Sequence, residues 1–95
     1  MRATKDQLDF IKAQINKFLP EAQVYLFGSR LDDNKHGGDI DILILSTKLL
    51  TFAQKIQVKL AFDQQFGEQK LDLVNYKFDD NSAFKNLILL EAKQI

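Results

Sequence analysis

Two short segments, LFGSR at residues 26–30 and GDIDI at residues 38–42, decide how this chain folds and what it can bind. The first ends an apolar stretch with a small, turn-forming pair, and the second opens a very apolar run with two aspartates. An ionised carboxylate buried alone is so costly that it normally pairs with a cation or binds a metal. Asp39 and Asp41 therefore need a partner, and the other segments must show whether that partner is a metal ion.

Length and composition limit the class of protein that this sequence can encode. The 95 residues predict one domain, 1–95, with a modest core, and a 45% apolar content with eight Phe indicates a globular fold. Thirteen acidic and thirteen basic side chains cancel, so extended nucleic-acid binding is not expected. The absence of cysteine excludes disulfides and thiolate metal sites. No apolar run approaches the ~20 residues of a membrane span, and no signal peptide is evident, so we expect a cytoplasmic protein without a membrane partner.

Periodicity and cap signals place the elements along the chain. Thr4 and Gln7 have the capping-box spacing, and Pro20 ends the first helical pattern. The expected order is a helix up to about residue 18, strands at 23–27 and 39–45, a helix at about 49–65, a strand at 70–76 and a helix at about 83–92. This order predicts an α+β or α/β-like fold, with a sheet carrying helices on one face.

Apolar residues on two of the expected helices bear on packing and association. In the helix at 49–65, one stripe is expected to form core, and it consists of Leu49, Phe52, Ala53, Ile56 and Leu60. The last helix has Phe84 and a run of four apolar residues at 87–90. That surface either packs onto the sheet or forms a partner interface.

Asp39 and Asp41 are two residues apart in a strand, so their side chains point to the same face. Oxygen-only ligation favours Mg²⁺ or Mn²⁺ over zinc. Asp72 is a lone acid in the apolar strand at 70–76. If that strand pairs beside the one at 39–45, Asp72 completes a cluster of three carboxylates, whose mutual repulsion cation binding would relieve.

Gly28, Ser29 and Arg30 offer an anion-binding turn that complements the predicted carboxylate cluster. Glycine lets the backbone approach a ligand closely, and the N–H groups of the following turn can bind an anion. Ser29 adds a hydroxyl and Arg30 a fork for phosphate. An anion cradle facing carboxylate-bound metals is what in-line phosphoryl or nucleotidyl displacement requires. Taken alone, Gly28–Ser29 is best interpreted as an ordinary turn and Asp72 as an acid on an edge strand, while Asp39 and Asp41 fit exposed acids as well as a site. Their combination favours a site.

Together, the segments at 27–30, 39–42 and 71–74 resemble the polymerase-β-type nucleotidyltransferase superfamily, and the short chain is similar to its minimal nucleotidyltransferase (MNT) branch. The resemblance implies a small mixed sheet of three or more strands with flanking helices, two Mg²⁺ ions and a nucleoside triphosphate donor, with ATP preferred. It implies that Gly28, Ser29 and Arg30 bind the nucleotide and that Asp39, Asp41 and Asp72 are catalytic metal ligands. Asp72 would also take the proton of the acceptor.

The resemblance also implies a function. MNT proteins resemble antitoxins that neutralise a helical HEPN-domain toxin by adding AMP to it, so a HEPN-type protein is the expected partner and a homo- or hetero-oligomer is conceivable. An alternative is a catalytically weak subunit that acts by covering its partner, which the acidic loop at 31–36 and the apolar last helix suggest. A metal-dependent nuclease or phosphatase that uses the same carboxylates is a third interpretation. It is less favoured, because the Gly28–Ser29 turn suits a triphosphate.

Overall fold

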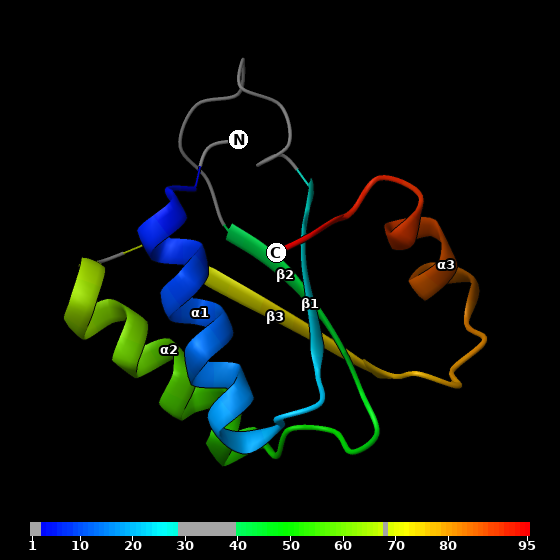
Figure 1. Cartoon of the computed structure of the whole chain (residues 1–95), viewed down its shortest axis with the longest axis horizontal. Helices are drawn as coiled ribbons and strands as arrows, with labels where there is room; N and C mark the ends of the chain where they lie inside the picture. Colours follow the sequence, from blue (N-terminus) through cyan, green and yellow to red (C-terminus); the bar gives the residue numbers. More distant parts are fainter. Residues whose placement is uncertain (1–2, 29–39, 68) are drawn as a thin grey trace.

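The computed structural model describes residues 3–28, 40–67 and 69–95. Within these ranges the chain forms three helices and four strands (Figure 1). Their order is α1 (Lys5–Phe18), β1 (Gln23–Phe27), β2 (Ile40–Ser46), α2 (Phe52–Phe66), β3 (Leu71–Lys77), α3 (Ala83–Leu89) and β4 (Lys93–Gln94). The fold is therefore α+β, as the sequence predicts, and the expected strand at 23–27 has the predicted bounds. No helix in the described part of the chain has the length and apolar character needed to cross a membrane.

The strands form one mixed sheet in the order β3-β2-β1-β4. β1 runs antiparallel to β2, while β2 and β3 are parallel and in register from Ile40↔Leu71 to Ser46↔Lys77. The parallel pair needs a crossover connection, and α2 supplies it. The C-terminal end of β1 therefore lies beside the N-terminal ends of β2 and β3.

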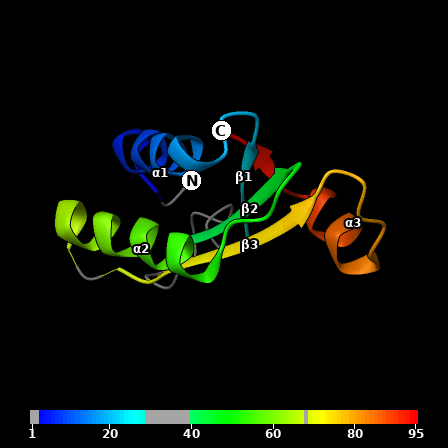
Figure 2. The same cartoon turned by 90° about the horizontal axis from the view of Figure 1, so that it is seen from below.

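The sheet is covered on both faces (Figure 2). Helices α1 and α2 lie on one side of it and α3 on the other. Ile40, Ile42 and Ile44 point towards α1 and α2, whereas Leu43 and Leu45 point towards α3. The expectation that all helices lie on one face is wrong. The run at 42–45 is apolar at every position because β2 is buried on both sides.

Both long helices begin where a threonine can cap them. In α1, Gln7 N donates to Thr4 Oγ1 at 3.1 Å and Thr4 N donates to Gln7 Oε1 at 3.0 Å, so the predicted capping box is confirmed. Thr51 and Gln54 form the same box at the start of α2. This second box places the start of α2 at Phe52, three residues later than predicted. Gly67 ends α2 as expected, with φ +85° and its N–H donating to the Asp63 carbonyl.

The predicted core stripe of α2 is wrong. Phe52 is 79% exposed and Leu60 55%, whereas the buried side chains of this helix are Val58 and Phe62. Phe62 lies in an aromatic cluster with Phe10 of α1, at a centroid distance of 6.4 Å, and with Phe66, at 5.0 Å. The helix has apolar residues on two faces, and the face that carries Val58 and Phe62 packs against α1 and the sheet.

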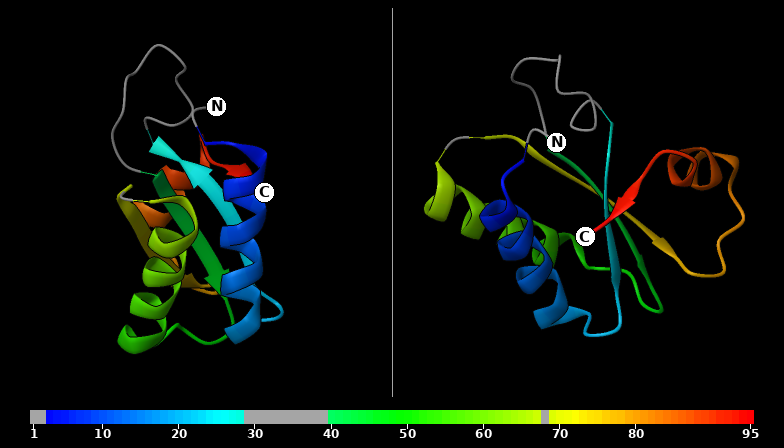
Figure 3. Two further views of the ribbon diagram at one scale, coloured as in Figure 1. Left: turned by 90° about the vertical axis from the view of Figure 1, so that its left-hand side faces the viewer. Right: turned by 45° about the horizontal axis from the view of Figure 1, so that its top comes forward.

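The C-terminal segment differs from the prediction in two ways. Helix α3 ends at Leu89, and the chain then forms the two-residue strand β4 beside β1 (Figure 3, right panel). Ile95 N also donates to the Val24 carbonyl at 2.9 Å. A strand this short has no periodic signal of its own. Of the apolar residues of the last helix, Ile88 packs on the sheet, while Phe84, Leu87 and Leu90 are exposed.

The loop before α3 is held by polar contacts. The Lys85 ammonium is buried and donates to the carbonyl oxygens of Lys77, Phe78 and Asp80 at 2.7 to 3.2 Å. Asp80 Oδ1 accepts from Ser82 N at 2.7 Å, and Ser82 caps α3. Backbone carbonyls of this loop thus satisfy a charge that would otherwise be costly to bury.

The two faces of α2 predict a measurable contrast in stability. Phe62→Ala should lower the free energy of unfolding by about 3–5 kcal/mol, because it leaves a cavity in the core. Phe52→Ala should change it by no more than about 0.5 kcal/mol, because that ring is exposed. Urea unfolding of both variants checks this, and the milder pair Phe62→Leu and Phe52→Leu keeps the comparison measurable if Phe62→Ala does not fold. Equal losses from the two positions would contradict the packing described.

The cap of α3 predicts a pH-dependent contribution to stability. Hydrogen bonding from Ser82, chiefly from its backbone N–H, lowers the pKa of Asp80 below its ordinary value of 3.8. A lowered pKa in the folded state stabilises the fold above the unfolded-state pKa, and this stabilisation is lost as the pH falls through the folded-state value. Asp80→Asn should therefore unfold at lower urea than the parent at about pH 7, and the difference should shrink as the pH falls below the ordinary pKa of 3.8. The control is Asp79→Asn, a substitution at the exposed neighbouring acid, measured over the same pH range.

Candidate functional site

Two of the predicted site carboxylates lie side by side. Asp41 of β2 and Asp72 of β3 are register partners in the parallel pair, and both are half-buried. Adjacent strands lie about 4.8 Å apart, and residues in register point to the same face. Here that face is the one that carries α3, because the neighbouring residues Ile40, Ile42 and Leu73 point to the other. The condition set by the sequence, that the third strand pairs beside the second, is met.

Gly28 lies against one of these carboxylates. It follows β1, whose last residue, Phe27, is the register partner of Asp41. Its φ of +75° is in the left-handed region. A Cβ atom placed on Gly28 would lie 3.2 Å from Cγ of Asp41 and would overlap its Oδ2. Glycine is thus required twice here, for the backbone conformation and for the space that the carboxylate occupies.

The other predicted site residues lie outside the described residues. Asp39, Ser29 and Arg30 all fall in the segment 29–39. Gly28 and Ile40 are the residues on either side of this segment, and both lie at the sheet end that carries Asp41 and Asp72. Their roles as metal ligand, hydroxyl donor and phosphate fork stay predictions.

The described carboxylates suit a hard divalent cation. Asp41 and Asp72 offer only oxygen atoms, come from two neighbouring strands and are half-buried, which strengthens their attraction for a cation. Among residues 3–28, 40–67 and 69–95, no group of three acidic, histidine or cysteine side chains converges on one point. Asp39, the third predicted carboxylate, lies outside the described residues.

Sequence reasoning missed two polar features of β3. Asn75 donates from Nδ2 to the Ile44 carbonyl and to Ser46 Oγ, both at 3.0 Å, and its Oδ1 accepts from Leu50 N at 2.7 Å. It thereby ties β2 and β3 to the segment that leads into α2. The signal was a lone amide within an apolar strand, the same kind of signal that drew attention to Asp72.

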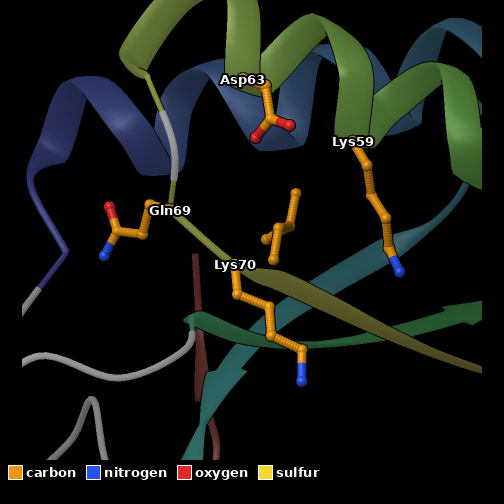
Figure 4. A pocket seen from close by; sticks show the side chains of 5 residues that line it. Lys59, Asp63, Gln69 and Lys70 are labelled. Atoms are coloured by element: carbon orange, nitrogen blue, oxygen red, sulfur yellow. The ribbon is translucent and has the colours of Figure 1, made fainter.

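The second missed feature is a pocket of about 340 Å³ at the start of β3 (Figure 4). It is lined by Lys59 and Asp63 of α2 and by Gln69, Lys70 and Leu71. The exposed Lys59 and Lys70 side chains both extend away from α2 in the same direction. The sequence could not reveal this pocket, because Lys59 and Lys70 are eleven residues apart and only the connection between α2 and β3 brings them together.

The chain belongs to the polymerase β nucleotidyltransferase family, because the sequence model of that family, described as "Polymerase beta, Nucleotidyltransferase", matches residues 6–95. A comparison with curated proteins gives no match. The family relationship agrees with the resemblance seen in the Gly28 turn and the strand aspartates.

Solved structures with the same fold include toxin–antitoxin complexes. A MntA–HepT complex matches with a TM-score of 0.68 and 18% identity, over 96% of this chain and 70% of that one. A toxin–antitoxin structure with AMP-PNP matches at 0.71 and 22%, over 90% and 69%. A tri-AMPylated Shewanella oneidensis HEPN toxin in complex with an MNT antitoxin matches at 0.61 and 21%, over 93% and 70%. At these identities the matches show a shared fold.

The contact between Gly28 and Asp41 predicts a coupling that unfolding can measure. Gly28→Ala should cost about 1–2 kcal/mol for the left-handed backbone. It should cost more than that in the parent, because the added methyl group overlaps the Asp41 carboxylate. In an Asp41→Ala background the excess should disappear and the backbone cost alone remain. Equal costs in both backgrounds would show that the carboxylate does not occupy this space.

Proposed function

We propose that this chain is a Mg²⁺-dependent nucleotidyltransferase that transfers AMP from ATP to a hydroxyl of a HEPN-type partner protein and thereby acts as its antitoxin. The observation that carries the proposal is the row formed by Gly28, Asp41 and Asp72 at one end of the sheet. It occurs in a chain of the nucleotidyltransferase family whose structural neighbours include an AMPylated HEPN toxin bound to its antitoxin.

Each residue has a distinct role in this proposal. The turn at Gly28 and Ser29 binds the triphosphate through backbone N–H groups, and Arg30 contacts a phosphate. Asp39, Asp41 and Asp72 would hold the cations, with Asp72 on the side of the acceptor. Mn²⁺ could replace Mg²⁺, because both prefer oxygen ligands. When bound, two such cations would stabilise charge on the attacking and leaving oxygens.

The reaction itself is an in-line displacement at the α-phosphorus. The acceptor oxygen forms a bond to phosphorus as the bond to the bridging oxygen of pyrophosphate breaks, and Asp72 receives the acceptor proton. Asp72 is suited to this role because it lies on β3, an edge strand of the sheet, where an acceptor can reach it from outside. Asp41 lies on the neighbouring inner strand β2.

A second candidate function is a binding subunit that neutralises a helical partner by association alone. The exposed apolar side chains of α2 and α3 favour this reading, since exposed apolar patches of some size mark association sites. It differs from the first in one respect: neutralisation would not need the aspartates.

Incubation with Mg²⁺, α-labelled ATP and a HEPN-type protein from the same genome distinguishes the two. We expect label to appear on the partner, and Asp41→Asn or Asp72→Asn to slow transfer by a factor on the order of 10²–10³, as when other preorganised charge-stabilising groups are removed. Asp79→Asn, an exposed acid just after the opposite end of β3, is the matched control and should transfer at the parental rate. Neutralisation that survives both site variants, without label transfer, would support the binding subunit instead.

A further inference from the structure

The outer face of α2 carries an apolar stripe that nothing in the described chain covers. Phe52, Ile56 and Leu60 are 79%, 39% and 55% exposed. Their four-residue spacing places them in one row along the helix. Leu49, just before the helix, is 48% exposed. We call this row, Phe52, Ile56 and Leu60, the α2 stripe.

More basic than acidic side chains lie near the α2 stripe in sequence. Lys48 and Lys59 are exposed and Lys55 is half-buried, while Asp63 is the acidic residue of α2. The whole chain has a net charge of zero, so this surface is more basic than the molecule as a whole. Two copies joined through the α2 stripe would bring lysines against lysines. An apolar surface with a basic border instead fits a partner whose own apolar residues are bordered by acids.

This surface continues towards the candidate site. Lys59 also lines the pocket at the start of β3, together with Lys70 (Figure 4). Lys70 precedes Asp72 by two residues. Ile40 N donates to the Lys70 carbonyl oxygen at 3.0 Å, so the backbone of Lys70 lies beside the start of β2. A segment bound along the α2 stripe and continued past Lys59 and Lys70 would meet the start of β3, an edge strand. Asp72 points to the sheet face opposite α2, so the acceptor group would have to pass around this edge to meet it.

The apolar residues exposed on α3 lack these features. Phe84, Leu87 and Leu90 have Asp79, Asp80 and Glu91 near them in sequence, and the one lysine of α3, Lys85, is buried against backbone carbonyls. The exposed Lys77 and Lys93 flank the same segment, so charges of both signs lie near it and no single sign of partner charge is selected. The α3 surface therefore serves as the natural comparison for the α2 stripe.

We infer that the α2 stripe and its lysines form the docking surface for the acceptor protein, which presents an amphipathic helix bearing acidic residues. Such a helix would place apolar side chains against Phe52, Ile56 and Leu60, in the way amphipathic helices bind apolar surfaces, and acidic side chains near Lys59 and Lys70. The acceptor role rests on the proposed function; the docking surface is tested separately by binding.

The experiment measures binding of the full chain to a HEPN-type protein from the same genome by calorimetry. The triple variant Phe52→Gln, Ile56→Gln, Leu60→Gln should bind at least about tenfold more weakly, because apolar anchors at an interface centre carry most of the affinity. Its matched control is Phe84→Gln with Leu87→Gln on α3, which should bind within about twofold of the parent. All of these side chains are exposed, and circular dichroism verifies that each variant is folded.

Charge is tested by one pair of single variants. Lys59→Glu should weaken binding and reduce its dependence on salt, whereas Lys12→Glu, exposed on α1, should bind like the parent. Parental affinity of the α2 variants, or loss of affinity in the α3 control, overturns the inference. The α2 stripe has another occupant, a second copy of this chain or a lipid surface, if the HEPN-type protein does not bind and the same α2 variants abolish self-association or binding to phosphatidylglycerol vesicles. That result also overturns the inference.

Failure of the inference and failure of the proposed function give different results. Binding that depends on the α2 stripe, without any label transfer, supports the docking surface and contradicts the transferase. Label transfer whose KM for the acceptor is unchanged in the α2 variants supports the transferase and contradicts the docking surface. A raised KM with an unchanged kcat supports both.

Discussion

The candidate site depends on the parallel pairing of β2 with β3. This register places Asp41 beside Asp72 although the two residues are 31 positions apart in sequence. The pairing in turn depends on α2, which crosses over the sheet and returns the chain in the same direction. A slip of one residue would turn every side chain of β3 to the opposite face and direct Asp72 into the apolar core. The buried Leu71 and Leu73 oppose such a slip, because it would turn them out of the core beneath α1 and α2 and towards the face that carries α3.

The polar end and the apolar body of the sheet serve different purposes. Residues 42–45 are buried on both faces, so β2 is held firmly and its first residues occupy a defined position. Gly28 reaches the same end from β1 and leaves room for the Asp41 carboxylate. A rigid scaffold that ends in closely spaced carboxylates is what a metal-dependent transferase needs, because its ligands must be held before the cation arrives.

The helix α2 shows why a correct pattern led to a wrong assignment of the core. Its apolar residues occur on two faces, so periodicity alone offers two candidate core faces. Periodicity favours the stripe at Phe52, Ile56 and Leu60. In the structure, Val58 and Phe62 are the residues that pack against α1 and the sheet. The contacts of Phe62 and Phe66 with Phe10 of α1 favour this orientation, and the other apolar face is left outside.

The sequence by itself determined the local features: the Thr4 cap and the Gly67 end of α2, the strand at 23–27, the apolar run of β2 and the aspartates that precede or interrupt apolar stretches. These features depend on neighbouring residues along the chain, so they can be read from it. Only the tertiary structure decided that Asp41 and Asp72 share a row, that α3 lies across the sheet from α1 and α2, and that β4 forms. Those outcomes depend on contacts between distant segments, whose packing and strand register no local pattern contains.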